Sequence, residues 1–259
     1  MTTTRPAPIR VAGATRARLT RVPHLIIEFP LKNKREVAVR CLGLLMLVLV
    51  GCGPAPTPVS VYALQQGQVA PNTWVHVQDA VVTGTGLAGF WVADPRGGAH
   101  SGIWVEMDML WDVSYPDVQR GARVDVTGVL MEFDYYGMWD GTVTEINGKQ
   151  GQVKVKGLAP EPEPVTVALE ELMDPVRAEP WEGVVIRVVG DFVVQEPSAG
   201  FGAWSVTEGT RRLVIQDSMV PIPKGLAPGE RFCGFTGIWQ YSFSEFKFEP
   251  RQPDDLCRP

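Results

Sequence analysis

The segment "GARVDVTGVL" (residues 121–130) returns later in the chain as "GERFCGFTGIW" (residues 229–239), with one inserted residue. The period is about 108 residues, and three upstream segments repeat in the same order. The further pairs are "WVHVQDAVVTG" (74–84) with "WEGVVIRVVGDFVV" (181–194), "GFWVADPRGGAHSGIWVEM" (89–107) with "GAWSVTEGTRRLVIQDS" (202–218), and "VSVYALQQGQVAP" (59–71) with "VTVALEELMDPVR" (165–177). Self-similarity at a fixed period indicates a repeated structural unit. The sequence therefore predicts two copies of one fold.

Each copy is built from short runs rich in Val, Trp, Phe and Thr and bounded by Gly, Pro and Asp, which is typical of strands. The predicted strands are 74–83, 90–94, 102–106, 123–132 and 141–146, then 183–194, 203–207, 212–216, 231–241 and 244–248. A long strand, two short ones, a longer connection and a long hairpin is the layout of an OB-fold barrel. An immunoglobulin-like pair would need about seven strands per unit. We therefore predict an all-β chain with two tandem five-stranded OB-like barrels.

The order of the motifs resembles bacterial OB domains that occur in exported proteins and beside secreted nucleases. In those domains a strand ending in Asp precedes a "GI-V" strand and then "GxxVxVTGxV". The matching pieces here are residues 90–94, 102–105 and 121–129. Both copies carry versions of them, so the resemblance covers nearly all of the chain after the leader.

The stretch "CLGLLMLVLVGCGPAP" (residues 41–56) is about half as long as a membrane-spanning helix and has the length of a signal-peptide core. Basic residues precede it, and Leu49-Val50-Gly51-Cys52 resembles the lipobox of bacterial lipoproteins. The resemblance implies diacylglycerol on Cys52, cleavage before it, and acylation of the new amino terminus by a palmitate-like chain. Several acyl chains together anchor a protein stably to a membrane. The alternative is a short buried helix.

These signals divide the chain into a leader (1–51), a lipidated tether (52–60), a first OB-like domain (61–156), a Pro-rich linker (157–164) and a second OB-like domain (165–259). The expected location is the cell envelope. Gly53 is not the aspartate that retains lipoproteins at the inner membrane in the best-known sorting rule. The outer membrane, facing the periplasm or the cell exterior, is therefore the expected destination.

The net charge of the chain after the leader limits the partners that we expect. The chain has 24 Lys+Arg and 29 Asp+Glu, and residues 1–51 hold 9 basic and 2 acidic residues, which leaves a net charge of −12 after the leader. Such a surface repels phosphate backbones. We therefore expect membrane lipid, through acylated Cys52, and an envelope protein or a glycan as partners, and nucleic acid as an unlikely one.

Two cysteines remain after the leader and the anchor, Cys233 and Cys257. An even pair in an exported chain predicts a disulfide. Free buried thiols are the alternative, and a redox pair is disfavoured because no Cys-x-x-Cys is present.

Motifs of catalysis and cofactor binding are weak. The segment "GTGLAG" (84–89) matches a dinucleotide-binding pattern, but a strand follows it where a helix is required, so we predict a glycine hairpin. His76 and His100 lack metal-ligand spacing, and we expect no metal and no cofactor. Asp94 and Glu208 end equivalent strands, where turn capping and an acid role are the alternatives.

Aromatic residues form the candidate ligand or partner surface. Alternation along the strands places Phe90 and Val92 on the core face and Trp91 on the other, and Trp104 likewise lies opposite the core. The hairpin "EFDYYGMWDG" (132–141) adds three candidates, Tyr135, Tyr136 and Trp139. OB folds bind ligands on the faces of strands 2 and 3 and at the hairpin between strands 4 and 5. The alternative is that these residues pack against the second copy or cap the barrel.

The expected function is that of a membrane-anchored envelope lipoprotein with a non-catalytic binding or structural role. One alternative is an oligonucleotide-binding accessory of a secreted nuclease, which the fold resemblance suggests. A second is a hydrolase with an unrecognised carboxylate site.

Overall fold

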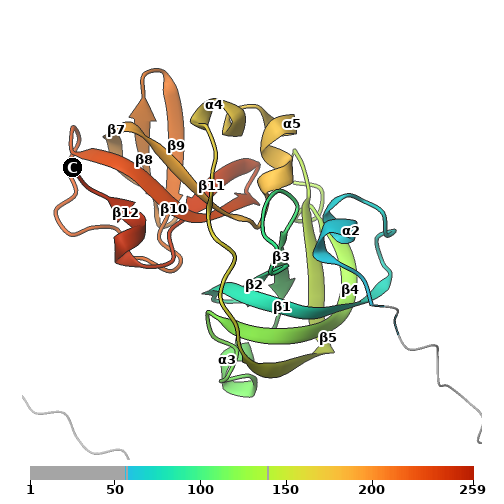
Figure 1. The fold of residues 1–259 in the computed structure, drawn as a ribbon. Coiled ribbons are helices and arrows are strands. Elements are labelled where there is room, and N and C mark those ends of the chain that lie inside the picture. Colours follow the sequence, from blue (N-terminus) through green and yellow to red (C-terminus); the bar gives the residue numbers. More distant parts are fainter. Residues whose placement is uncertain (1–55, 57, 139) are drawn as a thin grey trace, which may run out of the picture. The chain divides into compact units, whose positions relative to one another are not determined.

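The computed structural model describes residues 56, 58–138 and 140–259, which all belong to one compact unit, Pro54–Pro259. The predicted leader, the predicted lipidation site Cys52 and the aromatic Trp139 lie outside the described residues. Within the described ranges the chain is mostly β, as predicted (Figure 1).

The first five strands close into a barrel in the order β1-β2-β3-β5-β4. Their bounds are β1 Trp74–Gly86, β2 Gly89–Ala93, β3 Gly102–Glu106, β4 Ala122–Phe133 and β5 Val143–Leu158. All neighbours are antiparallel except β3 and β5, which run parallel. The prediction of a five-stranded OB-like barrel is confirmed.

The second sheet repeats this arrangement. Its strands are β6 Val165–Thr166, β7 Val185–Gly200, β8 Ala203–Glu208, β9 Arg211–Gln216, β10 Arg231–Ser242, β11 Glu245–Glu249 and β12 Leu256–Cys257. An extra pairing of β10 with β7 closes five of them in the order β7-β8-β9-β11-β10, again with one parallel pair, β9 with β11. The predicted repeat is therefore a repeat of topology.

The side chains on one face of the short strands are fully buried, and this face shows where the core lies. Phe90, Val92, Ile103 and Val105 are fully buried in the first core. In the second copy Trp204 and Val206 occupy the equivalent positions of β8 and are also buried. The predicted assignment of faces is confirmed.

Short helices and turns complete each barrel. They are α2 Val61–Gln65, α3 Trp111–Ser114, α4 Leu169–Leu172, α5 Pro175–Ala178, η1 Glu179–Trp181 and η2 Pro253–Asp255. Ser60 caps α2, and Val61 and Leu64 bury its apolar side in the first core. Leu169 and Leu172 of α4 do the same in the second core.

The residue inserted into the second copy lies at a β-bulge. The register between β10 and β7 shifts between Phe232 and Gly234, where Gly234 has φ +157°. A Cβ atom on Gly234 would collide with the Val188 carbonyl of the neighbouring strand. The insertion therefore keeps the barrel intact by bending one strand.

The linker segment is held by both barrels. Glu161 accepts hydrogen bonds from Arg120 of the first copy and Arg251 of the second, each at 2.6 Å. The strand β5 also extends to Leu158, twelve residues beyond the predicted end at 146. The predicted linker 157–164 is thus attached to folded structure at Leu158 and at Glu161.

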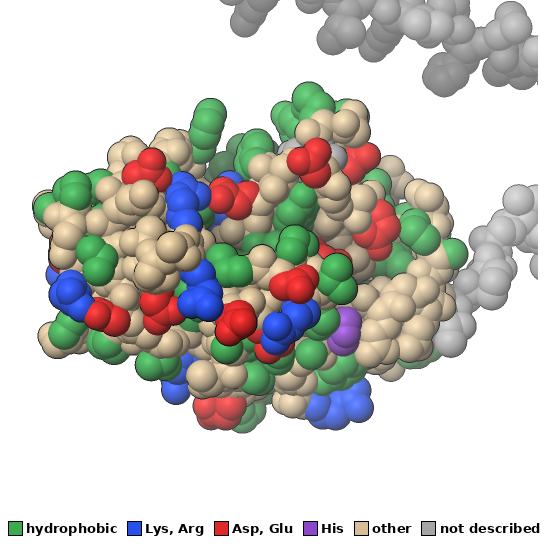
Figure 2. All heavy atoms as spheres, turned by 90° about the horizontal axis from the view of Figure 1, so that it is seen from above, with side chains coloured by type: hydrophobic (Ala, Val, Ile, Leu, Met, Phe, Trp, Pro, Cys, Tyr) green, Lys and Arg blue, Asp and Glu red, His purple; other side chains and the backbone are tan. Residues whose placement is uncertain are grey.

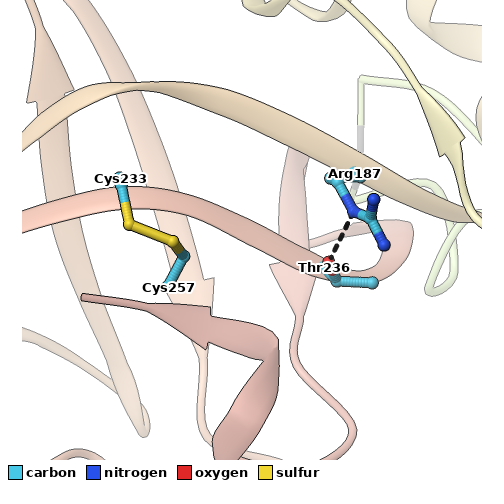
Figure 3. The surroundings of a disulfide bond; sticks show 4 residues. All are labelled: Arg187, Cys233, Thr236 and Cys257. Carbon is cyan, nitrogen blue, oxygen red and sulfur yellow. Dashed lines mark hydrogen bonds between the residues drawn. A yellow bond between two sulfur atoms is a disulfide. The ribbon is translucent and has the colours of Figure 1, made fainter. Parts of the chain in front are cut away.

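A disulfide joins Cys233 and Cys257 (Figure 3). It connects β10 to the short terminal strand β12, which pairs with β10 through Gly234 and Phe235. The bond closes a loop with a sequence separation of 24 residues. The terminal strand is therefore attached covalently as well as by two pairs of strand residues.

Removing this bond should destabilise the protein. The double substitution Cys233→Ser with Cys257→Ser should lower the free energy of unfolding by about 3 kcal/mol, because the unfolded chain gains loop entropy. Thermal unfolding should show a melting temperature lower by about 6–12 °C. Reductant should shift the wild type to the same temperature and leave the double variant unchanged. Equal melting temperatures for wild type and variant in the absence of reductant would contradict the assigned role of the bond.

Candidate functional site

The outer face of the first barrel carries a row of three side chains across three strands. Trp91 of β2 pairs with Trp104 of β3, and Trp104 pairs with Glu145 of β5. Directly paired residues of neighbouring strands project to the same face of a sheet. The row therefore faces away from the first core and toward residues of the second copy.

This row forms one wall of a groove with a volume of about 550 Å³, which we call the aromatic groove. The other wall comes from the second copy. The lining residues are Gly86, Leu87, Ala88, Trp91, Trp104, Glu106, Phe133, Val143, Glu145, Asp217, Ser218, Gln240, Tyr241, Ser242 and Glu249.

Trp91 joins the two barrels. It is 5% exposed and packs with Val185 and Ile238 of the second copy. Its indole N–H donates to Oε1 of Gln240 at 2.6 Å. The structure thus places Trp91 mainly in the packing role that the sequence left open.

Trp104 is the more accessible of the two indoles. It is half-buried, its ring centroid lies 4.4 Å from that of Trp91 at an interplanar angle of 55°, and its N–H donates to Glu106 at 2.9 Å. A Cβ atom on Gly86 or Gly89 would come within 3.1 or 2.8 Å of the Trp104 ring. The glycines of the predicted hairpin 84–89 therefore make room for this indole, and no helix follows them.

The hairpin tip between β4 and β5 presents further aromatics. Tyr135 and Tyr136 are 42% and 89% exposed, and both have positive φ angles, +47° and +63°. The Tyr135 ring lies 6.3 Å from that of Phe243, which occupies the equivalent hairpin tip of the second copy. Left-handed backbone at non-glycine residues is sparsely populated and clusters at ligand and switch sites.

Two buried carboxyl groups in the groove were missed by sequence reasoning. Glu145 is 5% exposed, and Glu249 of β11 is 4% exposed. Burial raises the pKa of Glu145 to about 8 and that of Glu249 to about 7. The only signal in the sequence is a glutamate between apolar strand residues, in "VTEI" and "FKFEP", which also fits an exposed strand face.

The hydrogen-bonding capacity of these carboxyls is not filled. Among residues 58–138 and 140–259, no group forms a hydrogen bond with the Glu145 side chain. Glu249 has Ser218 within reach, but its Oε2 atom is buried without a partner in the described part of the chain. Buried polar atoms usually have a partner.

Charged groups of both signs surround the groove. Glu106 forms an ion pair with Lys149 at 3.0 Å, and Lys247 lies 4.9 Å from the centre of the Phe243 ring. On the face drawn in Figure 2, acidic and basic side chains of the described residues are interspersed, and no broad basic area is present there.

The other sequence candidates have structural surroundings. Asp94 accepts a hydrogen bond from the Arg96 backbone and pairs with its guanidinium at 3.0 Å, and Glu208 accepts from the Asp191 backbone.

The ranges that the structure describes hold no group of three or more His, Cys, Asp or Glu placed to share a metal ion. No helix of the described residues has the length and apolar character that a membrane crossing needs.

Comparison with known proteins identifies similar folds at low similarity. No family model matches the sequence, and no curated protein matches it. Similar solved structures include a murine DNA binding protein bound with double-stranded DNA, at 10% identity and a TM-score of 0.33, covering 66% of this chain and 91% of that one. The HINa domain of Ifi202 in complex with a 20 bp double-stranded DNA is 11% identical, with a TM-score of 0.32, and covers 70% of this chain and 93% of that one.

These structures correct two expectations. Two of them contain double-stranded DNA, which contradicts the expectation that nucleic acid is an unlikely partner. The expected role without nucleic acid, with an envelope protein or a glycan as the ligand, is withdrawn with it. The predicted lipid anchor at Cys52 lies outside the described residues and stays a prediction. The physical reason is that a net charge sums over a whole surface and does not describe one groove. A TM-score near 0.3 assigns no ligand to this chain, so we base the function on the groove itself.

The raised pKa values of the groove predict a pH-dependent stability. A carboxyl whose pKa is raised in the folded state stabilises the fold fully below its unfolded pKa, and this contribution is lost as the pH rises through the folded value. The free energy of unfolding should therefore fall between about pH 4.5 and about pH 8, by at most about 1.4 kcal/mol per pH unit for each group.

Urea unfolding of wild type and Glu145→Gln at several pH values measures this contribution. The variant should lose less stability over the window, because its amide does not titrate. The difference between the two proteins isolates Glu145 from other groups such as His100, whose pKa burial lowers. Parallel pH profiles for the two proteins would exclude a buried, titrating Glu145.

Proposed function

We propose that the two-barrel unit binds single-stranded nucleic acid, with unpaired bases held in the aromatic groove, and that it does so without catalysing a reaction. One observation carries this proposal: the half-buried Trp104 indole on the outer face of β3. OB folds hold oligonucleotides on this face and at the hairpin between strands 4 and 5.

Stacking supplies the affinity in this proposal. A base that stacks on an aromatic side chain contributes about 1–3 kcal/mol, and every base has a face that can stack. Trp104 offers such a surface inside the groove, and Tyr136 offers one at the hairpin tip. A groove of about 550 Å³ has room for bases of a single strand, whereas a duplex keeps its bases stacked and paired.

Phosphate contacts play a small part. Two lysines lie beside carboxylates of the groove, Lys149 next to Glu106 and the largely buried Lys247 next to Glu249. Neither lysine lines the groove itself. Glu145 and Glu249 carry less negative charge near pH 7 than two ordinary glutamates, because their pKa values are raised to about 8 and about 7. The groove therefore repels a phosphate backbone less than the net charge of −12 suggests.

Binding of a short labelled strand to the full chain tests the proposal. Fluorescence anisotropy should show that Trp104→Ala weakens binding by about 5- to 150-fold, which corresponds to the stacking energy of one base. The slope of log K against log salt should be no steeper than about −1.4, because among the described residues two lysines lie beside the carboxylates of the groove.

Trp74→Ala is the matched control, since Trp74 is 48% exposed and lies outside the groove. It should bind the strand as the wild type does. Thermal unfolding of both variants separates lost stacking from lost folding. The absence of binding at low salt, or an equal loss in both variants, would refute the proposal.

The location of the protein is a separate proposal. We propose that the chain is an exported lipoprotein of a bacterial cell envelope, processed at Cys52, on the strength of the lipobox-like Leu49-Val50-Gly51-Cys52 and the basic residues before it. A nucleic-acid partner would then be met outside the cytoplasm.

Substitution of Cys52 tests this location. Cys52→Ser should remain uncleaved, and it should lose incorporation of a radiolabelled or clickable palmitate, because the sulfur that carries the lipid is absent. Mass and labelling of the expressed protein measure both effects. Cys41→Ser, within the apolar stretch, is the control and should be processed normally. A cleaved, labelled Cys52→Ser protein would show that the lipid is attached elsewhere.

A further inference from the structure

Two carboxyl groups with unfilled hydrogen-bonding capacity line the aromatic groove from opposite copies. Glu145 belongs to β5 of the first barrel, and Glu249 belongs to β11 of the second. Both residues are more than nine-tenths buried. Glu145 has no hydrogen-bond partner among the described residues, and Oε2 of Glu249 has none there either.

Such an arrangement is costly for a protein that holds nothing in the groove. Oε2 of Glu249 is a buried polar atom without a partner among the described residues, and burial disfavours the charged form of Glu145. Both effects destabilise the fold. Replacement of either glutamate by an apolar residue would remove that cost. Two carboxyl groups with unused hydrogen-bonding capacity beside an indole instead suit a particular kind of ligand. Such a ligand has a flat face that can stack on the indole and an edge with hydrogen-bonding groups.

We propose that Glu145 pairs with the hydrogen-bonding edge of one unpaired adenine or cytosine that stacks on Trp104, with Glu249 on the opposite wall. This inference rests on the proposed single-strand binding and adds a base preference to it. Trp104 and Glu145 are directly paired across β3 and β5, so one base can stack on the first and extend toward the second.

The chemistry of the pair explains the preference. A protonated carboxyl has a donor, its O–H, next to an acceptor, its second oxygen. Adenine and cytosine present a ring nitrogen that accepts and an adjacent amino group that donates. The Glu145 O–H then donates to the ring nitrogen, and its other oxygen accepts from the amino group. That basic ring nitrogen can share the proton, which strengthens the bond, whereas thymine has only weakly basic carbonyl oxygens beside its N–H.

The surroundings of Glu145 keep its carboxyl protonated at neutral pH. Burial is the main cause of its raised pKa of about 8, and neighbouring carboxylates add to it while one lysine opposes it. The charged and titratable groups that face it from the packed elements are Glu106 of β3, Glu132 of β4, Lys149 of β5, and Glu182 beside β7. Above its pKa, the ionised carboxylate would face the lone pair of the ring nitrogen and repel it.

The test uses the full chain and two labelled strands of about ten nucleotides, one of mixed dA and dC and one of dT only. Anisotropy titrations from about pH 6 to about pH 9 should show tighter binding of the dA/dC strand at neutral pH, by about fivefold or more. This binding should weaken about tenfold between about pH 7 and about pH 9, in a step centred near the pKa of about 8. Circular dichroism at each pH should show that the protein stays folded.

Three variants make the test specific. Glu145→Gln should lose the step near pH 8, because an amide offers a donor beside an acceptor at every pH. Glu145→Ala should bind both strands equally. Glu163→Gln is the matched control, since Glu163 is exposed and does not line the groove, and it should keep the step near pH 8.

The outcomes separate this inference from the proposed function. If the strands bind through Trp104 but the pH step persists in Glu145→Gln, or both strands bind alike, the base-reading role is overturned and single-strand binding stands. If neither strand binds at any pH, both proposals fall.

Discussion

The contact between Trp91 and the second barrel is the constraint on which the rest of the structure depends. Trp91 lies on the barrel face that an isolated OB fold would leave open, and it is 5% exposed because residues of β7 and β10 cover it. A buried indole N–H needs a partner, and Gln240 supplies one at 2.6 Å. This contact closes one end of the face and leaves Trp104 beside it partly open. The groove is therefore a product of barrel packing rather than of either barrel alone.

The glycine-rich turn before β2 follows from the same constraint. Positions 84, 86 and 89 lie against the two indoles, and position 84 also lies against side chains of the second copy. A Cβ atom would collide at 84 and 89 and would be tightly packed at 86. A segment that resembles a phosphate-binding motif thus has a packing explanation. The pattern alone could not distinguish these explanations, because both require backbone without side chains.

The sequence predicted the strands well because the barrel strands alternate apolar and polar residues and the repeat supplies each boundary twice. The faces of Trp91 and Trp104 followed from the same alternation, as Phe90 and Val92 show by their burial in the core. The second half of β5 was missed because the glycines of "GKQGQVKVKGL" indicated a loop, although "QVKVK" alternates valine and lysine as a half-buried strand does. Its strand character comes from pairing with the first half of β4, where Gly151 fits closely against the Thr127 backbone. Pairing of distant segments is tertiary information, and local propensity does not contain it.

The buried glutamates show why the net charge of the chain describes the groove poorly. A net charge of −12 counts each carboxyl as ionised, and that holds for exposed groups such as those in the turns. Glu145 becomes a neutral donor and acceptor only because β3, β4 and the second barrel surround it, and no window of sequence contains those neighbours. Desolvation changes both the charge of a group and the kind of hydrogen bond it can form. In a groove that buries its acids, the number of carboxyls therefore says little about repulsion, and their protonation decides which ligand fits.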